Sequence, residues 1–521
     1  MDTTSFTQHL EASASAIFKK ISSSTDQKTV ANFGRAAAIT WAMYIVASKL
    51  YSAFLGPLSS IPGPLGLKFY GVRFTPGIED PPGTSYKKLK AWHAKYGSIV
   101  RLGPNCINIA DKRMLQEIFR NDEVYLKGPM YIRLQKRSPP DLLSTIDRAK
   151  HKQRRRVLSP AFAVKYLNSL ETYMLKTTQA FFDRIDRDIA KTSNEQGYGQ
   201  VDIWILVHYL ALDIIGEAAF GKTFNMLEGN DHLVPRTITK NMKMLHYLVT
   251  HPISGPLKLM LPASSRGILK ANSELKEFMK EVIMERLVGG EKARRNDILQ
   301  ILIDTQHASN SEDRLTASAI AQETVLFLTA GSETTSNSMG FVVVELMTNP
   351  QALVKLRQEV DAIDFKPGHK LLLHEQVKHL PYLNAVINET LRLDAVVVGA
   401  LERVPTRDVV IDGRLFVPKG MDPAYWPEPE KWIPERWVPG SGAPPADTEA
   451  FLPFSTGPRN CVGKTFAEQE MRLSIANLIK LYDFQAIPEE VAASKDRCAF
   501  LTLTVKKNSY KVLVKRRVSG I

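Results

Sequence analysis

The residues around Cys461 are the part of this chain whose types and spacing are best suited to chemistry. A thiolate that binds a metal needs hydrogen-bond donors and positive potential, and the helical pattern that follows the cysteine places a helix N-terminus beside it. Gly457 allows the loop a tight, left-handed bend. Arg459 adds a fixed cation. Phe454 would cover the sulfur, and a dry shell of this kind tunes the potential of a metal. We therefore interpret Cys461 as a metal ligand.

The loop from Phe454 to Ala467 resembles the haem-ligand signature of the cytochromes P-450, the haem-thiolate monooxygenases. The resemblance implies haem b as cofactor and Cys461 as the axial ligand of its iron, where the thiolate favours O–O cleavage. Gly463 would let the following helix lie against the flat macrocycle, and Arg459 would meet a haem propionate. The alternative is a buried structural cysteine in a loop rich in Gly and Pro.

An acidic residue and an alcohol lie side by side in a long, otherwise apolar helical pattern, Glu333 and Thr334. The pattern predicts a helix from Thr316 to about Met347 that stops at Asn349. Gly331 and the clustered hydroxyl groups weaken the backbone ladder, so we expect the helix to open locally. The oxygen-activation motif of the family has this form, and the resemblance therefore implies that Glu333 and Thr334 are catalytic. A satisfied polar patch in a core helix is the alternative.

A second predicted helix, from Pro381 to Leu393, carries Glu389 and Arg392. The i, i+3 spacing puts these two residues on one face, where they can form an ion pair. The downstream segment Pro434–Trp437 resembles the second arginine segment of the family. The resemblance implies that Glu389, Arg392 and Arg436 form a buried triad whose role is structural.

Three more basic or imidazole side chains match positions that contact the haem propionates in the family: His151, Arg155 and Arg403. At the first position the family usually has Trp, with Arg four residues later. Imidazole can still donate a hydrogen bond to a carboxylate, so His151 is compatible with that role. For the basic stretch that contains the first two residues, a solvated helix face is the alternative.

The N-terminal part of the chain divides by composition. Residues 1–35 are polar and lack the pattern of a cleaved signal peptide. Residues 36–58 are largely apolar and about long enough to span a bilayer, which takes ~20 residues, although Lys49 interrupts them. An amphipathic or buried helix is the alternative. A Pro-rich hinge follows at 59–66, and residues 67–521 are expected to form the haem-binding monooxygenase domain.

Composition favours one large catalytic domain that is not built on a disulfide framework. The chain has 521 residues, of which 44% are hydrophobic, and no internal repeat, so it can bury a large core. Its 68 Lys and Arg exceed 54 Asp and Glu, and no nucleic-acid-binding motif accompanies this basic balance, which favours a membrane or an acidic partner. Its 3 cysteines indicate a reducing compartment.

The resemblance extends from about Ile61 to Val514 and looks most like fungal microsomal members. It implies a mainly α fold with a smaller β portion, preceded by a membrane-anchor helix, in the endoplasmic reticulum membrane with the catalytic domain facing the cytoplasm. The implied activity is insertion of one oxygen atom from O2 into an apolar organic substrate. NADPH–cytochrome reductase would supply the electrons, since this chain has no flavin or dinucleotide motif.

Two surfaces follow as hypotheses. Basic side chains near the thiolate could form a docking face for an acidic reductase: Lys152, Arg154, Arg156, Lys464 and Arg472. Apolar segments could form the walls of the substrate pocket: Met130–Leu134, Leu326–Ala330, Val396–Leu401 and Phe500–Leu503.

One segment departs from the family pattern. After Gly420 the chain passes through Met421 directly to Asp422 and Pro423, so about a dozen residues are absent, enough for one strand and a helical turn. Losing a paired strand would leave sheet hydrogen bonds unsatisfied. A non-catalytic relic is therefore one alternative function. A haem-thiolate isomerase or dehydratase that does not use O2 is another, against which Glu333 and Thr334 argue.

Overall fold

The structure, a computed structural model, describes residues 27–71, 83–135, 140–229, 237, 263–398, 401–406, 409 and 428–517. The chain forms two compact units. Residues 1–75 and 100–107 belong to the smaller unit, and residues 76–99 and 108–521 belong to the larger one.

The larger unit is mainly helical, as the sequence predicts. Its helices are α4 (Ser85–Tyr96), α5 (Lys112–Arg120), α6 (Pro129–Gln135), α7 (Arg148–Leu158), α8 (Val164–Ser169), α9 (Glu171–Thr192), α10 (Ile203–Phe220), α12 (Ala263–Ala293), α13 (Ile298–Asp304), α14 (Ala317–Thr348), α15 (Pro350–Asp361), α16 (His374–Val377), α17 (Pro381–Leu393), α18 (Lys464–Leu481) and α19 (Pro488–Ser494). Short 3-10 turns are η2 (Ser159–Phe162), η4 (Thr305–His307), η5 (Ser311–Asp313), η6 (Pro434–Trp437) and η7 (Gly457–Arg459).

The β portion of the larger unit consists of small antiparallel sheets. β3 (Tyr125–Lys127) pairs with β5 (Arg403–Pro405), and β7 (Arg497–Phe500) pairs with β8 (Thr502–Val505). A three-stranded sheet has the order β4 (Gly199–Asp202), β9 (Lys511–Arg516), β6 (Tyr482–Ala486). Long-range pairing of this kind joins the end of the chain to its middle.

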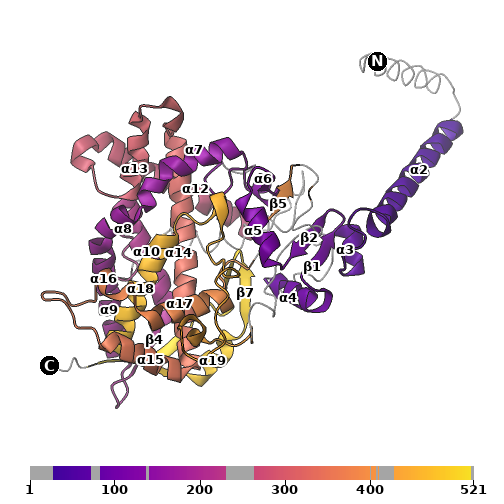
Figure 1. Cartoon of the computed structure of the whole chain (residues 1–521). Helices are drawn as coiled ribbons and strands as arrows, with labels where there is room; N and C mark the ends of the chain where they lie inside the picture. The colour runs from indigo at the N-terminus through magenta and orange to yellow at the C-terminus, as the bar shows by residue number, and fades with distance from the viewer. Residues whose placement is uncertain are drawn as a thin grey trace. The chain divides into compact units, whose positions relative to one another are not determined.

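The core of the larger unit is built around α14, which packs against α10, α12, α17 and α18 (Figure 1). The side chain of Thr316 accepts a hydrogen bond from the backbone of Ala319 and so caps α14, and Asn349 ends it, which confirms the predicted helix. A Cβ on Gly340 would lie 2.6 Å from the Trp204 ring, so this glycine lets α10 approach α14 closely.

Helix α10 is also apolar enough to resemble a membrane span. Among the helices of the described residues, it is the one whose length and hydropathy would suit a bilayer, but 78% of that stretch is buried in the protein. A helix that is apolar all round and covered on all sides is a core helix. The stretch predicted as an anchor does not reach the same hydropathy.

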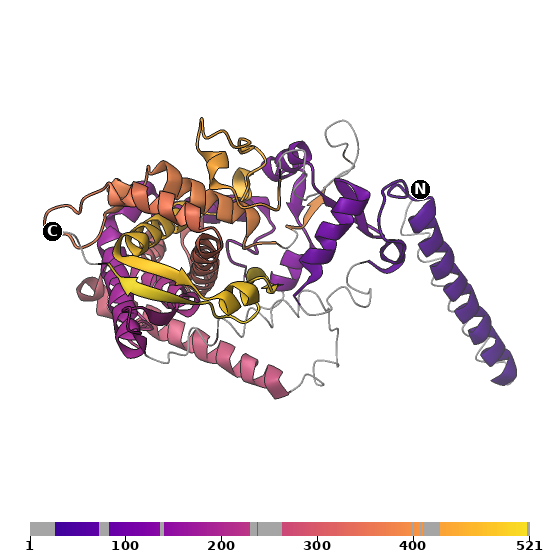
Figure 2. The same cartoon turned by 90° about the horizontal axis from the view of Figure 1, so that it is seen from below.

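The smaller unit contains α2 (Gln27–Phe54), α3 (Leu65–Tyr70) and most of the paired strands β1 (Ile99–Gly103) and β2 (Cys106–Ile109). Figure 2 shows α2 as one uninterrupted helix. Its bounds differ from the predicted 36–58, because the helix begins within the polar segment and ends before the Pro-rich segment. Large apolar side chains on α2 are exposed, among them Trp41 and Tyr44.

Candidate haem-thiolate site

The loop that carries Cys461 is a tight reversal between η7 and α18. The backbone N–H of Cys461 donates to the carbonyl of Phe454, at 2.9 Å. Ser455 and Gly457 both have positive φ, of 59° and 74°. A Cβ on Gly457 would lie only 2.1 Å from the carbonyl oxygen of Phe119, so the bend and the packing both require glycine there. The loop is therefore held against the end of α5.

The thiol of Cys461 is exposed, although protein groups surround it closely. Burial by these groups raises the pKa of the thiol. The backbone N–H groups of Gly463 and Lys464 and the cation of Arg155 lower this pKa and so favour the thiolate. These are the donors expected at the N-terminus of α18. A metal ion at the sulfur would remove the proton outright.

Gly463 gives a first test of whether a haem fits here. Its backbone, with φ −84° and ψ 8°, is accessible to any residue. A Cβ built on it would have the sulfur of Cys461, at 4.0 Å, as its nearest neighbour. Neither the backbone nor the packing of the described residues therefore requires glycine. A flat group bound at the sulfur would require it, and so the loop fits a macrocycle.

Five basic or imidazole side chains gather on the same side of the unit. Lys127 lies directly opposite Arg403 in the β3–β5 register, an arrangement of like charges that destabilises a strand pair. His151 on α7 is 3% exposed, and the side chain of Arg459 is also 3% exposed. The fifth member, Arg155, contacts the cysteine loop.

Burial, and after it the neighbouring cations, lowers the pKa of two members of this cluster. Burial, followed by the cations of Arg459 and Lys127, lowers the pKa of His151 to about 3, so its imidazole is neutral at pH 7. Burial, followed by Arg459 and Arg403, lowers the pKa of Lys127 to about 7. Both shifts disfavour further positive charge.

Within the described residues, Arg459 is the member of this cluster that forms an ion pair, with Asp122 at 3.3 Å. Buried cations normally require an anion. A group that carries two carboxylates, as haem does, would supply the missing negative charge. The cluster therefore fits the propionate side of a haem.

Two of these arginines also hold the loops around the site. Arg155 donates to the carbonyl and to the side-chain oxygen of Asn460, at 2.6 and 2.8 Å. Arg459 donates to the carbonyls of Thr145 and Ile146, at 2.8 and 3.1 Å. Each of them therefore fixes the backbone of the site in addition to contributing charge.

Lys127 is the member of the cluster that the sequence did not reveal. It stands alone in a short strand, and its place beside Arg403 depends on a strand pairing between distant parts of the chain. Its ammonium donates to the carbonyl of Leu143, at 2.5 Å. The sequence feature that could have revealed Lys127 is a lysine within an apolar segment, directly before Gly128.

The acid–alcohol pair lies on α14, which continues unbroken through it. The predicted local opening is therefore wrong for this structure, because the hydroxyl groups donate to carbonyls of the preceding turn and leave the helix intact. Thr334 donates to Ala330 at 2.7 Å, and Ser338 donates to Thr334 at 2.8 Å. Glu333 is half-buried, and α14 packs against α18, the helix that follows Cys461.

The structure brings Glu389, Arg392 and Arg436 together in a buried network. Arg392 binds both carboxylate oxygens of Glu389, each at 2.8 Å, and Arg436 approaches one of them at 3.4 Å. The indole of Trp437 and the backbone of Ile433 also donate to this carboxylate, at 3.0 and 2.8 Å. Helix α17 has the predicted bounds.

The predicted basic docking face is wrong for Arg154 and Arg472. Arg154 points inward and pairs with the fully buried Glu323 at 2.6 Å. Arg472 donates to Asn384 at 2.8 Å and is largely covered. A helix that faces both solvent and core distributes its basic residues between the two sides, which composition alone does not show.

The remaining members of that face are more exposed. Lys152 is exposed, and the half-exposed side chain of Lys464 approaches Glu468 at 3.8 Å. Arg156 is exposed and pairs with Asp313. The departure after Gly420 lies outside the described residues, as do residues 1–26 of the N-terminal tail and residues 399–400 of one predicted pocket wall.

Comparison with known proteins shows the family of this chain. The family model described as cytochrome P-450 matches residues 62–514, and the chain belongs to this family. The cytochrome P-450 monooxygenase LUC2 of a Fusarium species is 29% identical over 91% of this chain and 92% of its own length. Benzoate 4-monooxygenase bphA of Aspergillus niger is 30% identical over 82% of this chain and 87% of its own. Both relatives are fungal enzymes.

A solved structure supports the fold independently. The haem domain of cytochrome P-450DA superposes with a TM-score of 0.71 at 20% identity, over 88% of this chain and 97% of that one. The protein is thus a cytochrome P-450 monooxygenase, an oxidoreductase that incorporates oxygen from O2 with a haem-thiolate cofactor, a substrate and a redox partner.

Proposed function

We propose that this chain is a membrane-anchored monooxygenase that binds haem b through Cys461 and inserts one oxygen atom from O2 into an apolar organic substrate. The observation that carries the proposal is the pairing of a thiol held by helix N–H groups with a buried excess of cations on the same side of the unit. A structural cysteine would need neither feature.

In this proposal the chain's own residues hold the haem from two sides. Cys461 would bind the iron through its sulfur, with Gly463 leaving space for the ring and Phe454 covering the sulfur. His151, Arg155, Arg403 and Arg459 would face the propionates. When bound, a haem with a thiolate ligand supplies the iron at which O2 is reduced and one oxygen atom passes to the substrate.

Glu333 and Thr334 would deliver the protons that oxygen activation consumes. The hydroxyl of Thr334 donates to Ala330 in this structure and can rotate to donate elsewhere. Glu333, half-buried on the same turn, would exchange protons with water and pass them to that hydroxyl. The two residues therefore act as a proton relay on α14.

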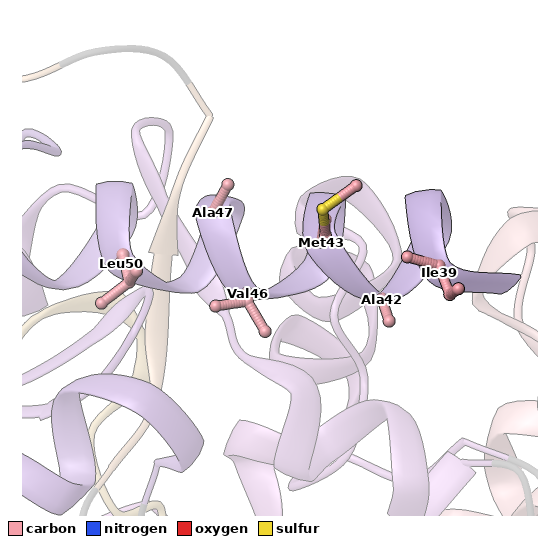
Figure 3. A pocket seen from close by; sticks show the side chains of 6 residues that line it. All are labelled: Ile39, Ala42, Met43, Val46, Ala47 and Leu50. Atoms are coloured by element: carbon pink, nitrogen blue, oxygen red, sulfur yellow. The ribbon is translucent and has the colours of Figure 1, made fainter. Parts of the chain in front are cut away.

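We further propose that α2 anchors the protein in the endoplasmic reticulum membrane, with residues 67–521 as the catalytic domain in the cytoplasm. Several large apolar side chains on α2 are exposed, including Trp41, which is 68% exposed. An open apolar pocket on this helix is lined by six side chains, which Figure 3 shows as sticks: Ile39, Ala42, Met43, Val46, Ala47 and Leu50. NADPH–cytochrome reductase in the same membrane would supply electrons.

The substrate would lie against apolar segments of α6, α14 and the β7–β8 turn. These carry the predicted walls Met130–Leu134, Leu326–Ala330 and Phe500–Leu503. Phe327, in the α14 segment, is buried and packs edge-to-face against Phe162, with ring centroids 5.1 Å apart. An apolar wall of this kind selects a substrate by shape and by burial.

The experiment is a carbon-monoxide difference spectrum of the reduced full-length protein in membranes, followed by turnover with reductase, NADPH and isotopically labelled O2. We expect a red-shifted Soret band of the thiolate type and one labelled oxygen atom in the product. A normal band with product formation that does not need O2 would instead favour the isomerase or dehydratase. A missing haem signal would contradict the proposal.

A further inference from the structure

Arg101, on β1, is a fully buried cation in the smaller unit. Its guanidinium remains charged at any physiological pH, so its burial requires strong compensation. Among the residues that the structure describes, no carboxylate forms an ion pair with it. Burial alone lowers the pKa of Arg101, in agreement with the absence of a counter-ion.

Backbone carbonyls take the place of that counter-ion. The guanidinium has five nitrogen-bound protons arranged in a planar fork, which suits several acceptors at once. Its acceptors are the carbonyls of Ser52 (2.8 Å), Ala53 (3.3 Å), Leu58 (3.0 Å), Gly103 (3.0 Å) and Pro104 (3.0 Å).

Two of these carbonyls belong to the last turn of α2. Carbonyls at a helix C-terminus have no partner within the helix, and the helix dipole places negative partial charge there. Arg101 satisfies Ser52 and Ala53, and its own backbone N–H donates to the carbonyl of Pro62 at 2.7 Å. A Cβ on Gly63 would lie 2.4 Å from the carbonyl oxygen of Arg101, so the chain packs tightly around this residue.

Helix α3 is fastened to α2 by a second cation. Lys49, the charge that interrupts the apolar run, donates to the carbonyl of Phe69 at 2.8 Å, near the end of α3. The rings of Phe54 and Phe69 pack edge-to-face with centroids 5.7 Å apart. The connection between the helices is therefore fixed at both of its ends.

The surface of this fastened pair of helices is apolar and basic. Leu55, Leu65 and Tyr70 are 74%, 59% and 64% exposed. Residues 27–71 contain no Asp or Glu, and their charged residues are all Lys or Arg. Exposed apolar side chains together with exclusively positive charge match the headgroup region of a membrane that contains anionic lipid.

We propose that Arg101 makes the Pro-rich connection a rigid joint, so that α2 and α3 meet an anionic lipid surface as one body. The proposal rests on the proposed membrane anchoring and replaces the expected hinge at 59–66 with a fixed connection. Arg101 thus acts as a positioning residue, which sets the orientation of the anchor relative to the strand on which it lies.

The test uses the full-length haem-loaded protein with nitroxide labels at Tyr44→Cys and Tyr70→Cys in a Cys106→Ser background. The protein is reconstituted in phosphatidylcholine vesicles with and without phosphatidylserine. Pulsed electron spin resonance measures the distribution of distances between the labels. Power saturation with O2 and with a water-soluble nickel chelate measures the depth of each label in the membrane.

We expect a single narrow distance peak, a Tyr44 label in the hydrocarbon region and a Tyr70 label at headgroup depth, deeper when phosphatidylserine is present. Arg101→Gln should replace the narrow peak with a broad distribution, and Arg101→Lys, which keeps the charge but loses the planar fork, should give an intermediate width. Arg113→Gln, at an exposed position on α5, is the matched control and should keep the narrow peak.

A narrow peak that survives Arg101→Gln would overturn the rigid joint. A Tyr70 label that is accessible only from water would overturn the docking of α3 on lipid. If the Tyr44 label is also accessible only from water, the proposed membrane anchoring is wrong. A narrow distance peak in the same sample would then show that the joint is nevertheless rigid, so the two failures can be distinguished. Should Arg101→Gln lose haem through misfolding, the width of the distance distribution measured for Arg101→Lys tests the rigid joint instead.

Discussion

Two buried clusters of charge in the larger unit differ in how their charges are paired. Around Glu389, one carboxylate receives donors from Arg392, Arg436 and Trp437, and its charge is fully compensated by protein groups. Around the cysteine loop, cations predominate, and among the described residues Arg459 is the one that forms an ion pair, with Asp122. Both clusters use arginine, yet the carboxylate of one is paired with two arginines, whereas most cations of the other form no ion pair with a described residue.

The difference separates a structural network from a binding site. A buried ion pair is held in place when hydrogen bonds satisfy its carboxylate, as around Glu389, and it then fixes the positions of α17 and η6. One nitrogen of Arg436, Nη1, has no partner among the described residues. A cluster that retains excess positive charge, such as Lys127 opposite Arg403, is destabilising by itself and gains stability when an anion binds. The balance of charge therefore indicates which cluster accepts a ligand.

The largest expected effect is that of Cys461→Ser, which removes the thiol from the cysteine loop beside the cation cluster. We expect the thiolate-type Soret band to disappear and turnover to fall to background, because a serine hydroxyl remains protonated and binds iron poorly. The carbon-monoxide difference spectrum and product formation measure both. Cys106→Ser is the control, and it should leave both unchanged. Normal turnover of the Cys461 variant would exclude this cysteine as the ligand.

Removal of the Glu389 carboxylate should lower the free energy of unfolding. Glu389→Gln leaves Arg392 and Arg436 without a carboxylate, and breaking a buried pair in this way costs about 3–5 kcal/mol. Urea unfolding monitored by circular dichroism measures the loss. Glu435→Gln, which removes a more exposed partner of Lys355, is the matched control with an expected loss of about 0–1 kcal/mol. Equal losses in the two variants would show that the Glu389 network is not essential to the fold.

Lys127→Met should change stability and haem affinity in opposite directions. Without haem, the variant should unfold at higher urea, because repulsion from Arg403 is relieved. With haem, affinity should fall about tenfold, equivalent to roughly 1.4 kcal/mol, because a cation that attracts the propionates is gone. Lys152→Met, at an exposed position on α7, should change neither quantity. Changes of the same sign would contradict the assignment of Lys127 to the propionate side.

The last expected effect concerns the pH dependence of the haem-free protein, and it appears only in acid. The pKa of His151 is lowered from 6.5 to about 3, so the folded state binds this proton less readily than the unfolded state. The resulting stability is fully present above pH 6.5 and is lost as the pH falls towards 3. His151→Gln should flatten this acid loss in urea midpoints measured across that range, whereas the exposed His307→Gln should not. An unchanged slope in the first variant would contradict the shift.

The sequence alone predicted the features that depend on local chemistry. The cap at Thr316, the bounds of α17 and the cysteine turn all follow from residue types within a few positions of one another. The Glu389–Arg392 pair follows likewise from its helical spacing. Motifs of this kind can be predicted from sequence because their interactions form between residues of one turn or one loop.

Only the tertiary structure decided the features that depend on distant segments. Lys127 joins the cation cluster because β3 pairs with β5, and Arg154 leaves the predicted docking face because Glu323 lies buried beside it. Arg101 encloses the Pro-rich connection because β1 returns to the end of α2. Spacing along the chain carries no information about such contacts, since burial and strand register determine whether a charge meets solvent, a carbonyl or another charge.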